Sequence, residues 1–117
     1  TTRPKVESFP NGVVIALSGE LDAYDAPALR ETFGAVTQNH AGAAVVLDLA
    51  AVTFLDSTAL GTMVGLLRRV RENGGELRVV LPETAARRIF EVTSLERALD
   101  VWPAAQPRQE SECLASV

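Results

Sequence analysis

The sequence predicts an α/β fold in which a mixed central sheet of four to five strands has helices packed against it. Short apolar segments alternate with segments whose apolar residues recur every three or four positions, which is typical of strands followed by helices. Residues 45–49 are almost continuously apolar, as in a strand that is covered on both faces. With 117 residues, 47% of them hydrophobic, the chain is expected to form one domain around a single core.

The chain is expected to open with a β-hairpin. Residues 6–9 and 13–17 are the two predicted strands, and Asn11 and Gly12 lie between them. An Asn-Gly pair supplies the positive φ angles that a tight turn needs. Two strands therefore begin the predicted sheet.

A helix is expected next. Asp25 can cap its N-terminus, and Pro27 is tolerated in its first turn. Apolar residues then recur at i, i+4 and i+7, namely Leu29, Phe33 and Val36. His40 and Gly42 mark its expected end, where a histidine interacts favourably with the helix dipole.

A third strand is expected over residues 44–49, and a central helix over residues 57–73. Gly74 and Gly75 follow this helix, and glycine readily adopts the left-handed conformation of a C-cap. The predicted apolar face of the helix consists of Leu60, Val64 and Leu67, widened by Met63 and Val70.

The remaining elements are a strand over residues 77–81, a helix, one short helical turn and a final strand over residues 99–102. The helix starts at Pro82, Glu83 and Thr84 and carries Ile89, Phe90 and Val92, and residues 93–96 have capping-box spacing. Beyond Pro103 the periodicity is lost. We therefore expect residues 1–103 to form the domain and residues 104–117 to form a mobile tail.

The junction between the third strand and the central helix places hydroxyl groups at a helix N-terminus. Free backbone N–H groups and the positive end of the helix dipole stabilise an anion there, so a phosphate on Ser57 fits electrostatically. Asp56, Ser57 and Thr58 are also all good N-cap residues, and on spacing alone capping is the commoner role.

Three blocks of the sequence match one known family. Residues 17–22 read Leu-Ser-Gly-Glu-Leu-Asp, residues 46–61 include Phe-Leu-Asp-Ser-Thr-Ala-Leu-Gly, and residues 74–95 begin Gly-Gly-Glu-Leu-Arg-Val-Val. In order and spacing they resemble the STAS family, specifically the bacterial anti-sigma factor antagonists that anti-sigma serine kinases phosphorylate. The resemblance covers roughly residues 5–103 and implies a single STAS-like domain.

The resemblance implies that Ser57 is the phosphoacceptor. One departure is Ala59, since the common family pattern has Gly at this position after the Ser or Thr. In a helix Ala is the better helix former, so the change stiffens the first turn. The residues expected to contact a partner around the acceptor are Asp22, Tyr24, Asp56, Thr58, Leu60 and Gly61.

The residues themselves leave other roles open for several of these side chains. Asp22 and Asp56 could equally accept hydrogen bonds from the backbone at a strand end. Tyr24 could lie at the edge of the core, and Thr58 could be a secondary phosphorylation site or bond within the first helical turn.

The function implied by the resemblance is partner switching in the bacterial cytoplasm, which regulates transcription. The unmodified protein would bind an anti-sigma factor serine kinase, which itself holds ATP, and so free a sigma factor. Phosphorylation of Ser57 would release it, and a phosphatase would reset it. The alternatives are an accessory STAS module of a transport or lipid-handling system and a stressosome-type scaffold, neither of which uses a phospho-switch.

Composition argues against several other functions. The net charge of −4 and the lack of a long Lys/Arg run argue against nucleic acid as the main partner. Six acids and one base lie between residues 20 and 57, whereas seven arginines lie between residues 68 and 97, and both sets are interpreted as solvated helix faces. With one His and one Cys, no zinc site is expected.

No enzymatic activity and no cofactor are expected either. The sequence lacks the G-x-S-x-G elbow of hydrolases and the Gly-Lys-Ser/Thr of a P-loop. His40 would be the one histidine base for Ser57 and belongs to a different helix. Cys113 is the single cysteine of the sequence, so no intramolecular disulfide can form, and a reducing compartment is expected. Neither end shows a leader segment, and no apolar stretch approaches the ~20 residues of a membrane span, so no membrane insertion is expected.

Overall fold

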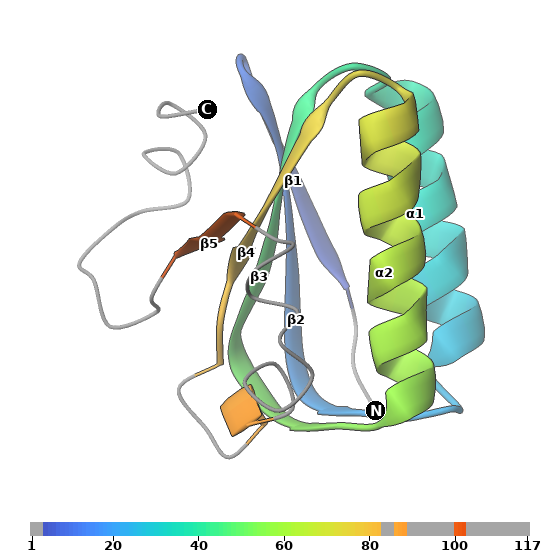
Figure 1. Ribbon diagram of the computed structural model, residues 1–117, viewed down its shortest axis with the longest axis vertical. Helices are drawn as coiled ribbons and strands as arrows, with labels where there is room; N and C mark the ends of the chain where they lie inside the picture. Colours follow the sequence, from blue (N-terminus) through green and yellow to red (C-terminus); the bar gives the residue numbers. More distant parts are fainter. Residues whose placement is uncertain (1–3, 83–85, 89–99, 103–117) are drawn as a thin grey trace.

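In the computed structural model, five strands form one mixed sheet in the order β1-β2-β3-β4-β5, and two long helices of the described part of the chain cover one of its faces (Figure 1). The structure describes residues 4–82, 86–88 and 100–102. The strands are β1 (Lys5–Phe9), β2 (Gly12–Leu21), β3 (Ala44–Leu55), β4 (Glu76–Val80) and β5 (Asp100–Trp102). The helices are α1 (Ala26–Asn39) and α2 (Ser57–Glu72). The predicted mixed sheet is therefore confirmed.

The topology brings two strand ends and two helix starts together. β1 and β2 pair antiparallel as the predicted hairpin, and β2, β3, β4 and β5 pair parallel. Because α1 connects β2 to β3 and α2 connects β3 to β4, both helices run back along the sheet. The carboxyl ends of β2 and β3 and the N-termini of α1 and α2 consequently lie at one end of the molecule (Figure 1).

Most predicted boundaries agree with the structure within a few residues. α1 ends with His40 as its C-cap, and Gly74, just past the end of α2, has the expected left-handed φ of 78°. The neighbouring Gly75 approaches the backbone closely, since a Cβ there would overlap the carbonyl oxygen of Ala43. The short final strand is present as β5.

Some predictions fall on residues that the structure does not describe. They are the residues of the predicted helix after Pro82 other than Ala86, Arg87 and Arg88, the predicted helical turn over residues 93–96, and the tail over residues 104–117. The boundary of the domain near residue 103 stays a prediction.

β3 is six residues longer than predicted, because it continues from residue 49 to Leu55. Its pairing with β2 shifts register at two places, so that 12 residues of β3 lie beside 10 residues of β2. At the first shift, the N–H of Ala50 donates to Asp48 Oδ1 at 3.0 Å. Extra residues in a strand change which face the following side chains occupy. The buried residues therefore recur at intervals of three, at Leu49, Val52 and Leu55.

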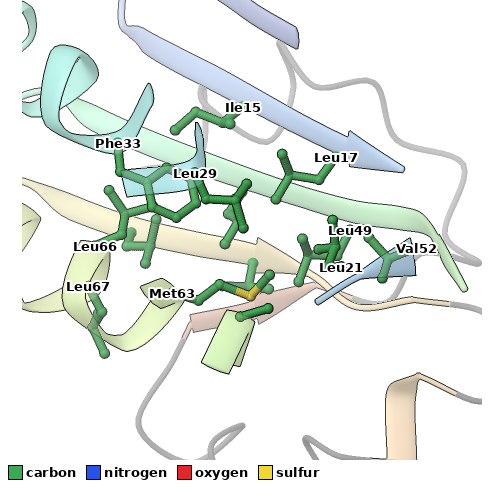
Figure 2. Packing of buried hydrophobic residues seen from close by; sticks show 14 of the residues in the cluster. Ile15, Leu17, Leu21, Leu29, Phe33, Leu49, Val52, Met63, Leu66 and Leu67 are labelled. Carbon is green, nitrogen blue, oxygen red and sulfur yellow. The ribbon is translucent and has the colours of Figure 1, made fainter. Parts of the chain in front are cut away.

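The core lies between the two helices and the sheet. Leu29 and Phe33 of α1 and Met63 of α2 pack there with strand residues such as Leu17 and Leu49 (Figure 2). The predicted apolar face of α2 differs from the structure at one position. Val64, which was predicted to belong to it, is half-buried, whereas Leu66, which was not, is buried in the core. A smaller cluster, formed by Val14 and Val46 with Phe9, Ala44 and Val80 packed against it, is separate from this core.

Over the residues that the structure describes, neither α1 nor α2 has an apolar stretch long enough to cross a bilayer.

Candidate functional site

Ser57 is the first residue of α2 and is exposed. Leu55, the last residue of β3, is only 6% exposed, and Asp56 continues in an extended conformation with φ −95° and ψ 175°. The chain therefore leaves the core and reaches the surface within two residues. The predicted change from strand to helix at Ser57 is confirmed.

The first turn of α2 has backbone donors available for an anion. The N–H of Ala59 donates to Asp56 Oδ1 at 2.9 Å, and the N–H of Leu60 donates to the Asp56 carbonyl oxygen at 3.0 Å. Within the described residues, the N–H groups of Ser57 and Thr58 have no acceptor. Such groups at the positive end of a helix dipole favour a nearby negative charge.

Asp56 links this helix start to the loop that follows β2. Its Oδ1 caps α2 through Ala59, and its Oδ2 accepts the N–H of Ala23 at 3.0 Å. The Asp56 N–H in turn donates to the carbonyl oxygen of Leu21 at 3.1 Å. The structure therefore shows the backbone-bonding role for Asp56, which the sequence left open.

The loop between β2 and α1 is held by three further hydrogen bonds. Asp22 Oδ1 accepts the N–H of Tyr24, and the Asp22 N–H donates to Asp25 Oδ2, both at 3.0 Å. The N–H of Asp25 donates to the carbonyl oxygen of Asp22 at 3.0 Å. Asp22 thus bonds the backbone as well.

The predicted capping role of Asp25 is wrong in one respect. Asp25 occupies the N-cap position of α1, but its side chain makes no capping hydrogen bond. Its backbone has φ −81° and ψ −19°, whereas a capping side chain needs the extended region to reach the helix N–H groups. The carboxylate instead points back to Asp22, and the residue is buried.

Tyr24 is 94% exposed, so the structure does not place it at the edge of the core. The backbone of its loop is nevertheless fixed by the bonds to Asp22 and Asp56. Phe54, which the sequence did not single out, is 49% exposed near the end of β3. Tyrosine is one of the residues enriched among those that contribute most to protein–protein binding.

The remaining predicted contact residues lie on the first turns of α2. Thr58 and Gly61 are exposed, and the Thr58 carbonyl oxygen accepts a hydrogen bond from the Thr62 hydroxyl at 3.0 Å. Leu60 is only 9% exposed and belongs to the core. The structure brings every predicted site residue to one end of the molecule, but it does not bring Leu60 to the surface.

A groove between α1 and α2 was not foreseen. It has a volume of about 280 Å³ and is lined by Arg30, Phe33, Thr58, Gly61, Thr62, Gly65, Leu66 and Arg69. A Cβ on Gly61 or Gly65 would meet nothing within 4 Å. Each glycine costs about 1 kcal/mol of helix stability relative to Ala. A side chain at either position would not clash with its neighbours, but it would occupy part of the groove.

The described residues offer no catalytic or metal-binding constellation. They contain no group of three His, Cys, Asp or Glu side chains that could hold a metal ion. His40 caps the C-terminus of α1, whereas Ser57 starts α2 at the opposite end of the molecule, so the imidazole is not placed to act as a base on the serine.

Comparison with known proteins agrees with this geometry. The family model of the STAS domain matches residues 3–106. The anti-sigma-B factor antagonist of Bacillus subtilis (strain 168) is 32% identical over 96 residues, which cover 82% of this chain and 86% of that protein. The anti-sigma-B factor antagonist of Listeria monocytogenes is 34% identical over 87 residues, 74% of this chain and 75% of that protein.

Solved structures show the same fold. An anti-sigma factor antagonist from Mycobacterium paratuberculosis superimposes with a TM-score of 0.78 at 30% identity, covering 100% of this chain and 94% of that chain. The phosphorylated form of the Bacillus protein SpoIIAA gives a TM-score of 0.72 at 22% identity, covering 97% and 98%. The chain therefore belongs to the STAS domain family, and its curated relatives are anti-sigma factor antagonists.

Proposed function

We propose that this protein is an anti-sigma factor antagonist whose binding to an anti-sigma factor is switched by phosphorylation of Ser57. The observation that carries the proposal is the exposed hydroxyl of Ser57 at the N-terminus of α2, beside a loop whose backbone is fixed by Asp22 and Asp56. The relatives are regulatory binding proteins, and this chain likewise acts by association rather than by catalysis.

The proposed cycle has two states. With Ser57 unmodified, the protein binds an anti-sigma serine kinase that carries ATP, and the sigma factor held by that kinase is freed for transcription. The kinase transfers a phosphoryl group to Ser57, and the phosphorylated protein leaves. A phosphatase restores the hydroxyl. All of these steps would take place in the cytoplasm.

The domain can accept the phosphate without refolding. Phosphorylation adds about 1.5 to 2 negative charges at pH 7, and the helix dipole returns about 0.3–1 kcal/mol of favourable interaction. Both oxygens of the neighbouring Asp56 carboxylate already accept backbone N–H groups, which offset part of its charge. The cost of the phosphate therefore arises mainly where the partner covers it.

The proposed contact surface surrounds Ser57. Tyr24 supplies an aromatic anchor on a loop that is ordered before binding, so little conformational entropy is lost when it is covered. Asp22, Asp56, Thr58 and Gly61 complete the surface at the start of α2. A dianion at its centre would meet the partner's own surface and bound nucleotide, which adds repulsion and desolvation.

Intact-mass analysis tests the modification itself. The probe is the anti-sigma kinase that is recovered with the unmodified protein from its own host and then purified. After incubation with ATP, we expect the wild-type protein and the Thr58→Ala variant to gain one phosphoryl group, and Ser57→Ala to gain none, because the exposed hydroxyl of Ser57 is the acceptor.

A mass gain in Ser57→Ala would move the acceptor to another residue. No gain in any variant would favour an accessory module of a transport or lipid-handling system. Large assemblies detected by light scattering would favour a stressosome-type scaffold.

A further inference from the structure

We infer that the groove between α1 and α2 receives an acidic segment of the same anti-sigma partner, held from both sides by Arg30 and Arg69. The inference rests on the proposed function and extends it, because it adds a second contact area with its own chemistry. The Ser57 surface is where the phosphate acts on the association, and the groove adds affinity through separate contacts.

The charge of the groove points to an acidic occupant. Arg30 comes from α1 and Arg69 from α2, and none of the described residues that line the groove is an Asp or a Glu. Within the part of the chain that the structure describes, neither Arg30 nor Arg69 forms an ion pair with a carboxylate. Arginine also pairs carboxylates with two parallel hydrogen bonds, which fixes their orientation. The groove is thus a cationic surface on a protein with a net charge of −4.

Arg69 of α2 lies close to the backbone of α1. A Cβ on Gly34 of α1 would lie 3.4 Å from Arg69 Nη1, so the guanidinium group of α2 reaches across to the other helix. On the side of α2, Gly61 and Gly65 leave open space above the helix backbone. A segment of the partner can therefore approach this backbone closely while its carboxylates face the two arginines.

The partner that reaches Ser57 must also cover one end of the groove, because Thr58 lines it and directly follows Ser57. Arg69 stands 12 residues after Ser57 along α2, which is about 18 Å along the helix axis. That separation exceeds the screening length of about 8 Å at physiological salt. A phosphate on Ser57 therefore changes the interaction at Arg69 very little.

A charge reversal with a neighbouring control tests the proposal. The probe is the purified kinase of the intact-mass experiment, with ADP, and the readout is calorimetric affinity for the unmodified protein. We expect Arg69→Glu and Arg30→Glu each to weaken binding by about tenfold or more. Arg68→Glu changes the net charge equally but lies outside the groove, and it is expected to change the affinity by less than about twofold.

Gly65→Leu provides a test without a charge change. Its Cβ has room and leucine favours the helix, so the fold is kept, which thermal unfolding checks. The side chain fills the groove, and we expect a loss of about tenfold or more here too. Equal losses for Arg68→Glu and Arg69→Glu, or wild-type affinity for Gly65→Leu, would overturn the groove proposal alone. If the wild-type protein itself does not bind the kinase, the proposed function fails and the groove proposal falls with it.

Discussion

Ser57→Asp is expected to weaken binding to the anti-sigma kinase about a hundredfold, whereas Ser57→Ala is expected to bind like the wild-type protein. A penalty of a few kcal/mol is enough for this loss, because about 1.4 kcal/mol corresponds to a factor of ten in affinity. The new carboxylate stands next to Asp56, whose charge is already present at the centre of the surface. Removing the hydroxyl adds neither charge nor bulk.

Calorimetric titration of both variants with the purified kinase and ADP measures the difference. Ser8→Asp is the matched control, since it adds the same charge at an exposed position on the edge strand β1. It is expected to leave the affinity within about twofold of the wild-type value. If the Ser8 and Ser57 substitutions weaken binding equally, net charge and not position is responsible.

Asp56→Ala is expected to lower the free energy of unfolding by about 2–3 kcal/mol. The variant loses the cap on the N–H of Ala59 and the bond from the N–H of Ala23 in the preceding loop. A lost cap costs about 1 kcal/mol, and the second bond, which is exposed but has a charged acceptor, contributes about 1–2 kcal/mol. Urea unfolding measures the difference, and the melting temperature is expected to fall by about 10 °C.

Asp56→Ser separates the two bonds. A serine hydroxyl still caps the helix, but it cannot also reach the N–H of Ala23, so we expect about half of the loss seen for Asp56→Ala. If Asp56→Ala and the wild-type protein have the same free energy of unfolding, the carboxylate does not stabilise the site.

Local sequence patterns predicted the elements whose ends are marked by residues with particular backbone preferences. Gly74 located the end of α2, because a C-cap needs a left-handed backbone angle. Asn11 and Gly12 located the hairpin, but the predicted turn angles were wrong: Gly12 is the first residue of β2 and has no positive φ, and the turn consists of Pro10 and Asn11. The end of β3 could not be found in this way. Its register shifts change the spacing of buried residues from two to three, and these shifts depend on pairing with a strand far away in the sequence.

The same distinction holds for the site. The change of residue pattern from strand to helix drew attention to Ser57, and the resemblance to the STAS family marked it as the expected phosphoacceptor. The bond from Ala23 to Asp56 joins residues 33 apart, and the groove joins Arg30 to Arg69, so neither leaves a periodic trace. Asp25 was assigned to capping from its residue type, but its backbone angles direct the carboxylate elsewhere.

The most direct test compares two forms of one protein: the unmodified chain and the chain carrying phosphate on Ser57, each titrated into the purified anti-sigma kinase with ADP. We predict that the phosphorylated form binds at least about a hundredfold more weakly. Equal affinities of the two forms would contradict the account, because the phosphate would then not control the association.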